Sequence, residues 1–228
     1  MSIRENYLRI VDNVADAAIR SGRRPEDIEI VAVTKFVDID RIHQAIEAGA
    51  YSVGENRVQE FVDKLPFFCE HNVKKNIIGQ LQTNKVKYVL NHCDLIQSVD
   101  RLPLAEEISK RSSTMGIIQD VLIEVNIGDE VQKGGIRVAD AMSLVTAVSE
   151  LPGIAVKGLI CIPPVLGESG VRKHFAAMRE LFLRIAASDI SGVQMRYLSM
   201  GMSGDYIAAI EEGSNMVRIG TALFGSRY

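Results

Sequence analysis

The strongest constraint on the fold is an alternation of short apolar runs with longer stretches of helical periodicity. The runs are rich in Val, Ile and Leu, and we expect a strand at each of 28–33, 51–54, 76–79, 95–98, 119–125, 155–160, 196–199 and 216–219. They are mostly apolar rather than alternating, as in parallel strands that are covered on both faces. Strands that alternate with helices build parallel βαβ units, so the sequence predicts an α/β fold.

Two architectures fit this pattern, a closed eight-stranded barrel and an open doubly wound sheet. Eight units in 228 residues, with no GxGxxG motif after the first strand, favour the barrel. The first twenty residues add an amphipathic helix, which Ser2 and Glu5 begin with the spacing of a capping box. No low-complexity or linker-like segment marks a boundary. We therefore expect residues 1–228 to form a single TIM (β/α)8 barrel domain with an additional N-terminal helix.

Composition excludes several classes of protein. The net charge of −3 argues against binding to nucleic acid or to a membrane surface by bulk charge. The N-terminus lacks the apolar region of a secretory signal, and no apolar stretch is long enough to span a membrane. The three cysteines contain no CxxC pair, and the four histidines have no ligand spacing, so we expect no disulfide framework and no metal site. These features predict a reduced, cytoplasmic protein.

Lys35 follows the first predicted strand, where the mouth of a barrel begins. In TIM barrels the functional residues lie at the carboxyl ends of the strands and in the loops that follow them. One interpretation is a strand-end lysine whose ammonium reaches solvent. The other is a desolvated amine that is suited to forming a Schiff base. The lysine by itself does not decide between them.

The segments after the seventh and eighth predicted strands, 198–205 and 217–221, place small residues, backbone amides and the hydroxyls of Ser203 and Thr221 where helices begin. Such groups bind phosphate, and these two loops are the usual phosphate site of the barrel. The alternative is that they are only caps and turns. Likewise, Asn56 either caps a helix or faces the barrel mouth. Lys133 stands in a glycine-rich loop and is either simply solvated or a transient acceptor of a ligand.

These segments together resemble the pyridoxal phosphate (PLP) homeostasis protein family. The resemblance runs from 28 to 224, which is essentially the whole chain. It rests on AVTKF at 32–36, GENRVQEF at 54–61, IGQLQTNK at 78–85, SVDR at 98–101, EVNIGDEVQKGGI at 124–136, KGLICIPP at 157–164 and LSMGMSGDYIAAIEEGSNMVRIGTALFG at 198–225. The last block, combined with the lysine after the first strand, is the most specific part.

The resemblance implies a barrel like the N-terminal domain of alanine racemase, with PLP as cofactor. It implies that Lys35 is the Schiff-base lysine, that Asn56 contacts the ring, and that Arg218 meets the pyridine nitrogen. It also implies a set of phosphate contacts: Ser199, Ser203, Gly220 and Thr221. The chain departs from the family pattern where an aromatic residue, two histidines and an acid are common, at Lys75, Asn76, Gln97 and Gly204.

Arginine only donates hydrogen bonds, so Arg218 beside the ring nitrogen would keep that nitrogen unprotonated and the ring a weak electron sink. Racemisation also needs two acid/base groups on opposite faces of the ring, and Tyr206 is better explained by packing than by catalysis. We therefore expect a monomeric protein that buffers or delivers PLP, with apo PLP-dependent enzymes as recipients and no catalytic residue. The alternatives are a low-activity amino-acid racemase and a barrel enzyme acting on another phosphorylated metabolite.

Overall fold

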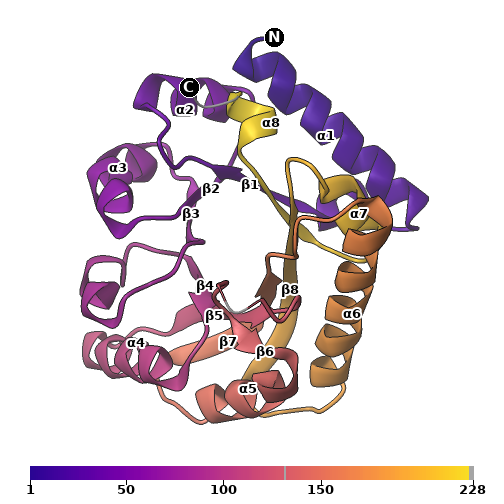
Figure 1. Cartoon of the computed structure of the whole chain (residues 1–228). Coiled ribbons are helices and arrows are strands. Elements are labelled where there is room, and N and C mark those ends of the chain that lie inside the picture. The colour runs from indigo at the N-terminus through magenta and orange to yellow at the C-terminus, as the bar shows by residue number, and fades with distance from the viewer. Residues whose placement is uncertain (131, 226–228) are drawn as a thin grey trace.

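The computed structural model describes residues 1–130 and 132–225 and contains a closed barrel of eight parallel strands (Figure 1). The barrel strands are β1 (Glu29–Val33), β2 (Ser52–Glu55), β3 (Lys74–Ile77), β4 (Leu95–Val99), β5 (Gln119–Asn126), β7 (Ile154–Cys161), β8 (Val193–Met202) and β9 (Met216–Ile219). Their order is β4-β3-β2-β1-β9-β8-β7-β5, and pairing of β4 with β5 closes the ring. The predicted TIM barrel is confirmed.

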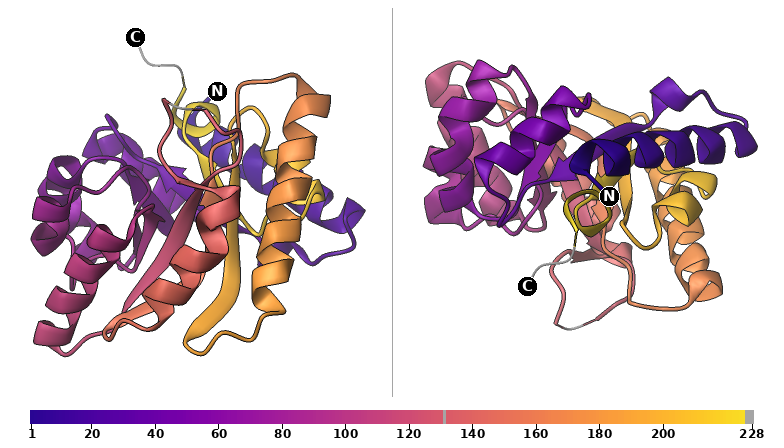
Figure 2. Two further views of the ribbon diagram at one scale, coloured as in Figure 1. Left: turned by 60° about the horizontal axis from the view of Figure 1, so that its bottom comes forward. Right: turned by 90° about the horizontal axis from the view of Figure 1, so that it is seen from above.

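The helices surround the barrel as an outer layer (Figures 1 and 2). They are α1 (Ile3–Arg20), α2 (Ile39–Glu47), α3 (Val58–Glu70), α4 (Leu102–Met115), α5 (Ala141–Ser149), α6 (Glu168–Ala186), α7 (Tyr206–Glu211) and α8 (Thr221–Phe224). Short 3₁₀ helices occupy Pro25–Asp27, Thr83–Tyr88 and Val138–Asp140. None of the helices in the described ranges is long and apolar enough to cross a membrane.

The predicted N-terminal helix is confirmed together with its capping box. Ser2 Oγ accepts from the N–H of Glu5 at 3.1 Å, and Glu5 Oε2 accepts from the N–H of Ser2 at 2.8 Å. Helix α1 then packs on the barrel near β1, where Tyr7 donates its hydroxyl hydrogen to the carbonyl of Gly49 at 3.0 Å. Because the apolar face of α1 is buried, this helix is packed into the outer helical layer.

The observed strands differ from the predicted ones in two places that matter for the site. Strand β8 was expected at 196–199 but runs from Val193 to Met202, three residues further at its carboxyl end. A two-residue strand that the sequence did not indicate, β6 (Ile136–Arg137), pairs with the end of β5. It lies in a glycine-rich segment without an apolar run, so no periodicity marks it.

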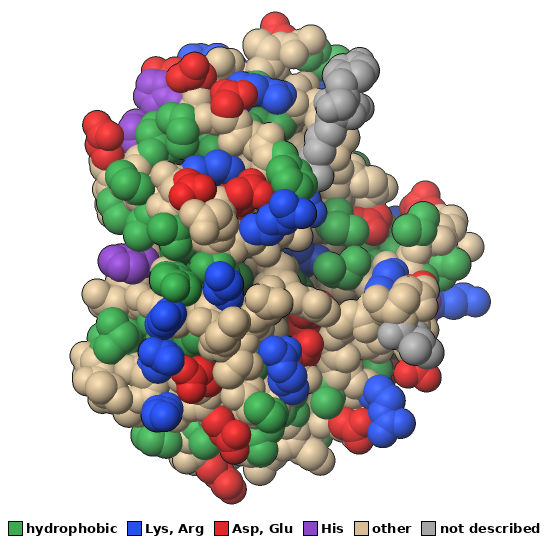
Figure 3. Space-filling model, turned by 60° about the vertical axis from the view of Figure 1, so that its left-hand side comes forward, with side chains coloured by type: hydrophobic (Ala, Val, Ile, Leu, Met, Phe, Trp, Pro, Cys, Tyr) green, Lys and Arg blue, Asp and Glu red, His purple; other side chains and the backbone are tan. Residues whose placement is uncertain are grey.

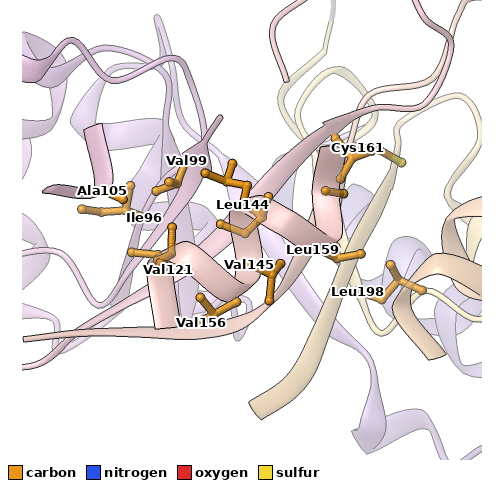
Figure 4. Close-up of a cluster of buried hydrophobic side chains, with 14 of the residues drawn as sticks. Ile96, Val99, Ala105, Val121, Leu144, Val145, Val156, Leu159, Cys161 and Leu198 are labelled. Carbon is orange, nitrogen blue, oxygen red and sulfur yellow. The ribbon is translucent and has the colours of Figure 1, made fainter. Parts of the chain in front are cut away.

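Most of the hydrophobic core lies between the strands and the helices. Figure 4 shows part of it, where side chains of β4, β5, β7 and β8 meet those of α4 and α5. Inside the barrel the apolar cluster is much smaller and consists of Val31, Leu95, Leu122, Ile160 and Met216, with Tyr197 packed against it. TIM barrels usually fill their interior with layers of branched apolar side chains. Buried polar side chains, among them those of Asn76, Gln97, Ser199 and Arg218, take up further space in this interior.

Candidate functional site

A pocket of about 480 Å³ opens at the carboxyl ends of β1, β8 and β9. This volume is in the range of small-molecule sites. Its walls are Val33, Lys35, Met202, Ser203, Gly204, Arg218, Gly220 and Thr221. Five of the residues singled out from the sequence therefore lie around one cavity: Lys35, Ser203, Arg218, Gly220 and Thr221.

Arg218 forms the floor of this pocket and is only 3% exposed. Its Nη1 donates to Ser199 Oγ at 2.7 Å, and its Nη2 donates to the carbonyl oxygen of Cys161 at 2.8 Å. Burial lowers the pKa of the guanidinium, because the charged form loses hydration. The two acceptors that hold this buried cation are neutral, and the charges of Glu124 and Asp205 act on it without a hydrogen bond to it.

Ser203 lines the same pocket and follows Met202, the register partner of Arg218 in β8. Its Oγ accepts from the backbone N–H of Gly220 at 3.3 Å and of Ala222 at 3.1 Å. Two amides at the start of the last helix thus converge on one oxygen. Converging backbone donors of this kind bind phosphate oxygens, and the exposed Thr221 lies between them.

The segment that carries Lys35 is held from both sides by acidic residues. Thr34 Oγ1 donates to Glu55 Oε1 at 2.7 Å, and the backbone N–H of Phe36 donates to Glu60 Oε2 at 2.6 Å. Lys35 itself is half-buried. Its backbone is therefore fixed at the residue before it and at the residue after it.

Lys64 of α3 joins these acidic residues into one cluster. Its Nζ donates to Glu55 Oε1 at 2.8 Å and to the carbonyl of Thr34 at 2.7 Å, and it lies 3.5 Å from Glu60 Oε2. This cluster was not predicted from the sequence. A glutamate at the end of an apolar strand, with another glutamate and a lysine at helical spacing after it, is the signal that could have indicated it.

Two predicted site residues do not line the pocket. Ser199 is fully buried in the barrel interior beneath Arg218, because β8 continues past it to Met202. Asn56 borders a separate depression of about 300 Å³, with Arg57, Gln80 and Lys85 among its walls. The cap position of α3 is Arg57, so Asn56 is not the cap of that helix. Its Oδ1 is buried without a hydrogen-bond partner among the described residues.

Lys133, also singled out from the sequence, has partners within its own neighbourhood. Its Nζ donates to the carbonyl of Pro163 at 3.0 Å and pairs with Glu130. These bonds connect the loop after β5 to the loop after β7. The interpretation of Lys133 as simply solvated is therefore incomplete, since it joins two loops at the barrel mouth.

Glu124 is a further buried acid, and it was not predicted as a site residue. It lies in β5, is 8% exposed, and its Oε2 has no hydrogen-bond partner among the described residues. Burial raises the pKa of its carboxyl to about 7, and the negative charge of Asp100 adds to this shift. A single glutamate in the apolar run of β5 is the signal that could have indicated it.

The remaining residues provide little alternative chemistry. No group of three or more His, Cys, Asp or Glu side chains in the described ranges could hold a metal ion. Figure 3 shows Lys and Arg side chains intermixed with Asp and Glu over one face of the molecule. The pocket at β1, β8 and β9 is thus the site with converging donors and an amine.

Comparison with known proteins places the chain in a family. A family model described as alanine racemase, N-terminal domain, matches residues 7–228. The pyridoxal phosphate homeostasis protein of Aquifex aeolicus is 42% identical over 228 residues, with 100% of this chain and 99% of that protein covered.

Solved structures give the same result. A protein of Bifidobacterium adolescentis, described as unknown, shares 38% identity and a TM-score of 0.92, covering 97% of this chain and 94% of that one. PipY of Synechococcus elongatus, solved with PLP bound, shares 29% identity and a TM-score of 0.80, covering 93% of this chain and 100% of that one. The chain belongs to the alanine racemase N-terminal domain family, and within it to the pyridoxal phosphate homeostasis proteins.

Proposed function

We propose that this protein binds PLP at the pocket of β1, β8 and β9 and buffers or delivers this vitamin B6 cofactor in the cytoplasm. The observation that carries the proposal is the convergence of a lysine, a buried arginine and phosphate-binding groups on one cavity. The names of the relatives support the ligand, since one is a PLP homeostasis protein and another was solved with PLP bound.

The residues present fit the phosphate end of PLP. The N–H groups of Gly220 and Ala222 already converge on the Ser203 hydroxyl oxygen. A phosphate oxygen carries negative charge and accepts hydrogen bonds more strongly than a hydroxyl does. We therefore assign Ser203, Gly220 and Thr221 to the phosphate. Gly204, which has open space where a side chain would stand, leaves room beside them.

The residues also fit the ring and its aldehyde. When bound, PLP supplies an aldehyde that an amine can capture and a ring that can withdraw electrons. Lys35 is the amine that lines the cavity, and we assign it the covalent attachment. We assign Arg218 to the ring nitrogen, because a guanidinium can only donate and so leaves that nitrogen without a proton. This pairing favours binding of the cofactor over catalysis with it.

A second candidate function is a low-activity PLP-dependent amino-acid racemase. It needs a proton-carrying group across the ring from Lys35. Glu124 is the observation in its favour, since β5 lies four strands from β1 in either direction around the barrel. Tyr206 is less suited, because its hydroxyl oxygen accepts from Asn13 Nδ2 of α1 at 3.0 Å. Circular dichroism of L- and D-alanine with the PLP-loaded protein would show racemisation, and Glu124→Gln would abolish it if this acid carries the proton.

Delivery requires that the cofactor leave again, and we propose apo PLP-dependent enzymes as recipients of a monomeric carrier. Transfer faster than release of free PLP allows would support direct delivery. Lys133 joins two mouth loops and is our candidate for a transient acceptor. A transfer rate that is unaltered in Lys133→Ala would remove it from the proposal.

The test of the main proposal is the visible absorption of the protein with PLP, followed by borohydride reduction and peptide mapping. We expect a yellow protein whose reduced adduct maps to Lys35. Lys35→Ala should lose the adduct and keep the fold, while Lys87→Ala, which removes an exposed lysine of the Thr83–Tyr88 segment, should keep both. A wild-type protein that stays colourless with PLP, or a reducible adduct that persists in Lys35→Ala, would overturn the assignment.

A further inference from the structure

A chain of hydrogen bonds between buried side chains crosses the barrel interior and ends on Arg218. Asn76 accepts from Gln97, whose Nε2 lies 3.0 Å from Asn76 Oδ1. Ser199 donates to Gln97 Oε1 at 2.8 Å, and Arg218 Nη1 donates to Ser199 Oγ at 2.7 Å. These four side chains are between 0% and 3% exposed. They come from β3, β4, β8 and β9, so the chain joins opposite sides of the ring.

The direction of every hydrogen bond in this chain is fixed by its two ends. At one end, Arg218 can only donate, so Ser199 Oγ must accept from it and give its own hydrogen to Gln97. At the other end, Asn76 Nδ2 lies 2.9 Å from the carbonyl oxygen of Val53, which can only accept. Asn76 Oδ1 is therefore left to accept from the amide nitrogen of Gln97. Both ends demand the same orientation of the Gln97 amide.

An ion pair anchors the Asn76 end of this hydrogen-bond chain. Asn76 Nδ2 donates to Ser52 Oγ at 3.0 Å, and Ser52 Oγ donates to Glu29 Oε1 at 2.9 Å. Glu29 in turn pairs with Lys74 Nζ at 2.7 Å. Fully satisfied buried networks of this kind hold side chains in one arrangement, because leaving any member unpaired costs free energy.

This arrangement gives Arg218 an unusual setting. The two acceptors that orient it, Ser199 Oγ and the Cys161 carbonyl, are neutral. No carboxylate of the described residues is hydrogen-bonded to the guanidinium, although the charges of Glu124 and Asp205 act on it, so its donors remain available to a ligand in the pocket. A carboxylate at the Gln97 position would place negative charge one hydroxyl away from the guanidinium.

We propose that Gln97 and Ser199 are positioning residues that direct the guanidinium of Arg218 at the ring nitrogen of bound PLP. This inference depends on the proposed function. Ser199 acts through the arginine rather than on the phosphate, and Gln97 fixes the hydroxyl of Ser199. The chain of neutral groups holds the arginine as a fixed donor with its charge intact, so the ring nitrogen stays unprotonated.

The test uses the full-length protein and PLP, with binding and the visible spectrum as readouts. Protonation of the ring nitrogen withdraws electrons from the conjugated ring, so the position of the visible band reports on the contact with Arg218. We expect Ser199→Ala to shift this band and to raise the dissociation constant of PLP about tenfold, the effect of losing a hydrogen bond to a charged group. Gln97→Leu should act in the same direction.

Two controls separate positioning from general damage to the barrel. Ser214 is equally buried but bonds only to backbone carbonyls of β8 and β9, so Ser214→Ala should leave the band unmoved. Gln119 bonds to the carbonyls of Cys93 and Asp120, so Gln119→Leu is the matched control for Gln97→Leu.

The outcomes are distinguishable. A wild-type band and dissociation constant in Ser199→Ala would overturn the positioning role, as would an equal band shift in Ser214→Ala. Neither result would affect PLP binding by Lys35. A wild-type protein without any visible band would instead overturn the proposed function on which the inference depends.

Discussion

The backbone N–H of Phe36 donates to Glu60 Oε2 at 2.6 Å, so helix α3 fixes the residue that follows Lys35. Phe36 has a φ of 59°, in the left-handed region that a bulky side chain rarely adopts. Such a conformation persists only where the surrounding structure holds it. Glu60 supplies that constraint, and the position of the Lys35 amine depends on it.

We therefore expect Glu60→Ala to weaken PLP binding without touching the pocket itself. Loss of the bond to Phe36 lets the segment 34–36 sample other conformations, and we expect the dissociation constant to rise about threefold to tenfold. Spectroscopic titration with PLP would measure this. Glu70→Ala, at the exposed end of the same helix, is the control. Equal PLP binding by the two variants would show that the hydrogen bond from Phe36 to Glu60 does not position Lys35.

The buried carboxyl of Glu124 should make stability depend on pH. Burial raises its pKa from 4.5 to about 7, so the folded protein holds this proton more tightly than the unfolded chain does. Between these values the unfolded state binds fewer protons, and the free energy of unfolding falls as the pH rises. The loss is complete above pH 7 and amounts to about 3 kcal/mol.

Glu124→Gln removes this titration. The variant should match the wild type at pH 4 and exceed its stability at pH 8, as measured by urea unfolding. Glu150→Gln changes an exposed acid and should give no such difference. If Glu124→Gln is no more stable than the wild type at pH 8, the carboxyl is ionised in the folded state at little cost.

Two glycines of the segment 198–205 should respond very differently to alanine. Gly201 has a φ of 94°, and a Cβ there would lie 2.5 Å from the Cβ of Ala209 in α7. Gly204 has open space at the same position. We expect Gly201→Ala to lower the free energy of unfolding by at least about 2 kcal/mol and Gly204→Ala by less than about 0.5 kcal/mol. Urea unfolding without PLP measures both, and equal losses would contradict the packing of α7 on the end of β8.

The three cysteines should differ in reactivity toward a thiol reagent. Cys69 is exposed, whereas Cys93 and Cys161 are buried and burial raises the pKa of each to about 12. Because the thiolate is the reactive form, we expect only Cys69 to react quickly in the native protein and all three to react after unfolding. Cys69→Ser should remove the fast reaction. Fast labelling of Cys161 in that variant would mean that the barrel opens readily.

The strands could be predicted because both of their faces are buried, which leaves continuous apolar runs. The site could be predicted as far as it lies at strand ends, since closure of the barrel brings Lys35 together with Arg218 and Thr221. Ser199 could not be placed, because the prediction ended β8 there and the strand continues to Met202. Because of that extension, the side chain of Ser199 lies inside the barrel rather than at its mouth.

The polar interior could not be predicted for a different reason. Asn76 and Gln97 are buried polar residues of β3 and β4, and nothing local shows what they contact. Gln97 and Ser199 are 102 residues apart in the sequence. Such partners become neighbours only when the ring closes, so their hydrogen bond belongs to the tertiary fold alone.

The pocket joins the first strand of the barrel to the last, since β1 pairs with β9. During synthesis the amino-terminal part of a chain leaves the ribosome first. Lys35 is therefore made early, while Arg218 and Gly220 appear only when almost the whole chain exists. A nascent or broken chain that lacks β9 has the amine but not the pocket residues that β9 and the following segment supply. Only a closed barrel that contains β9 would therefore bind the cofactor, and incomplete chains would not.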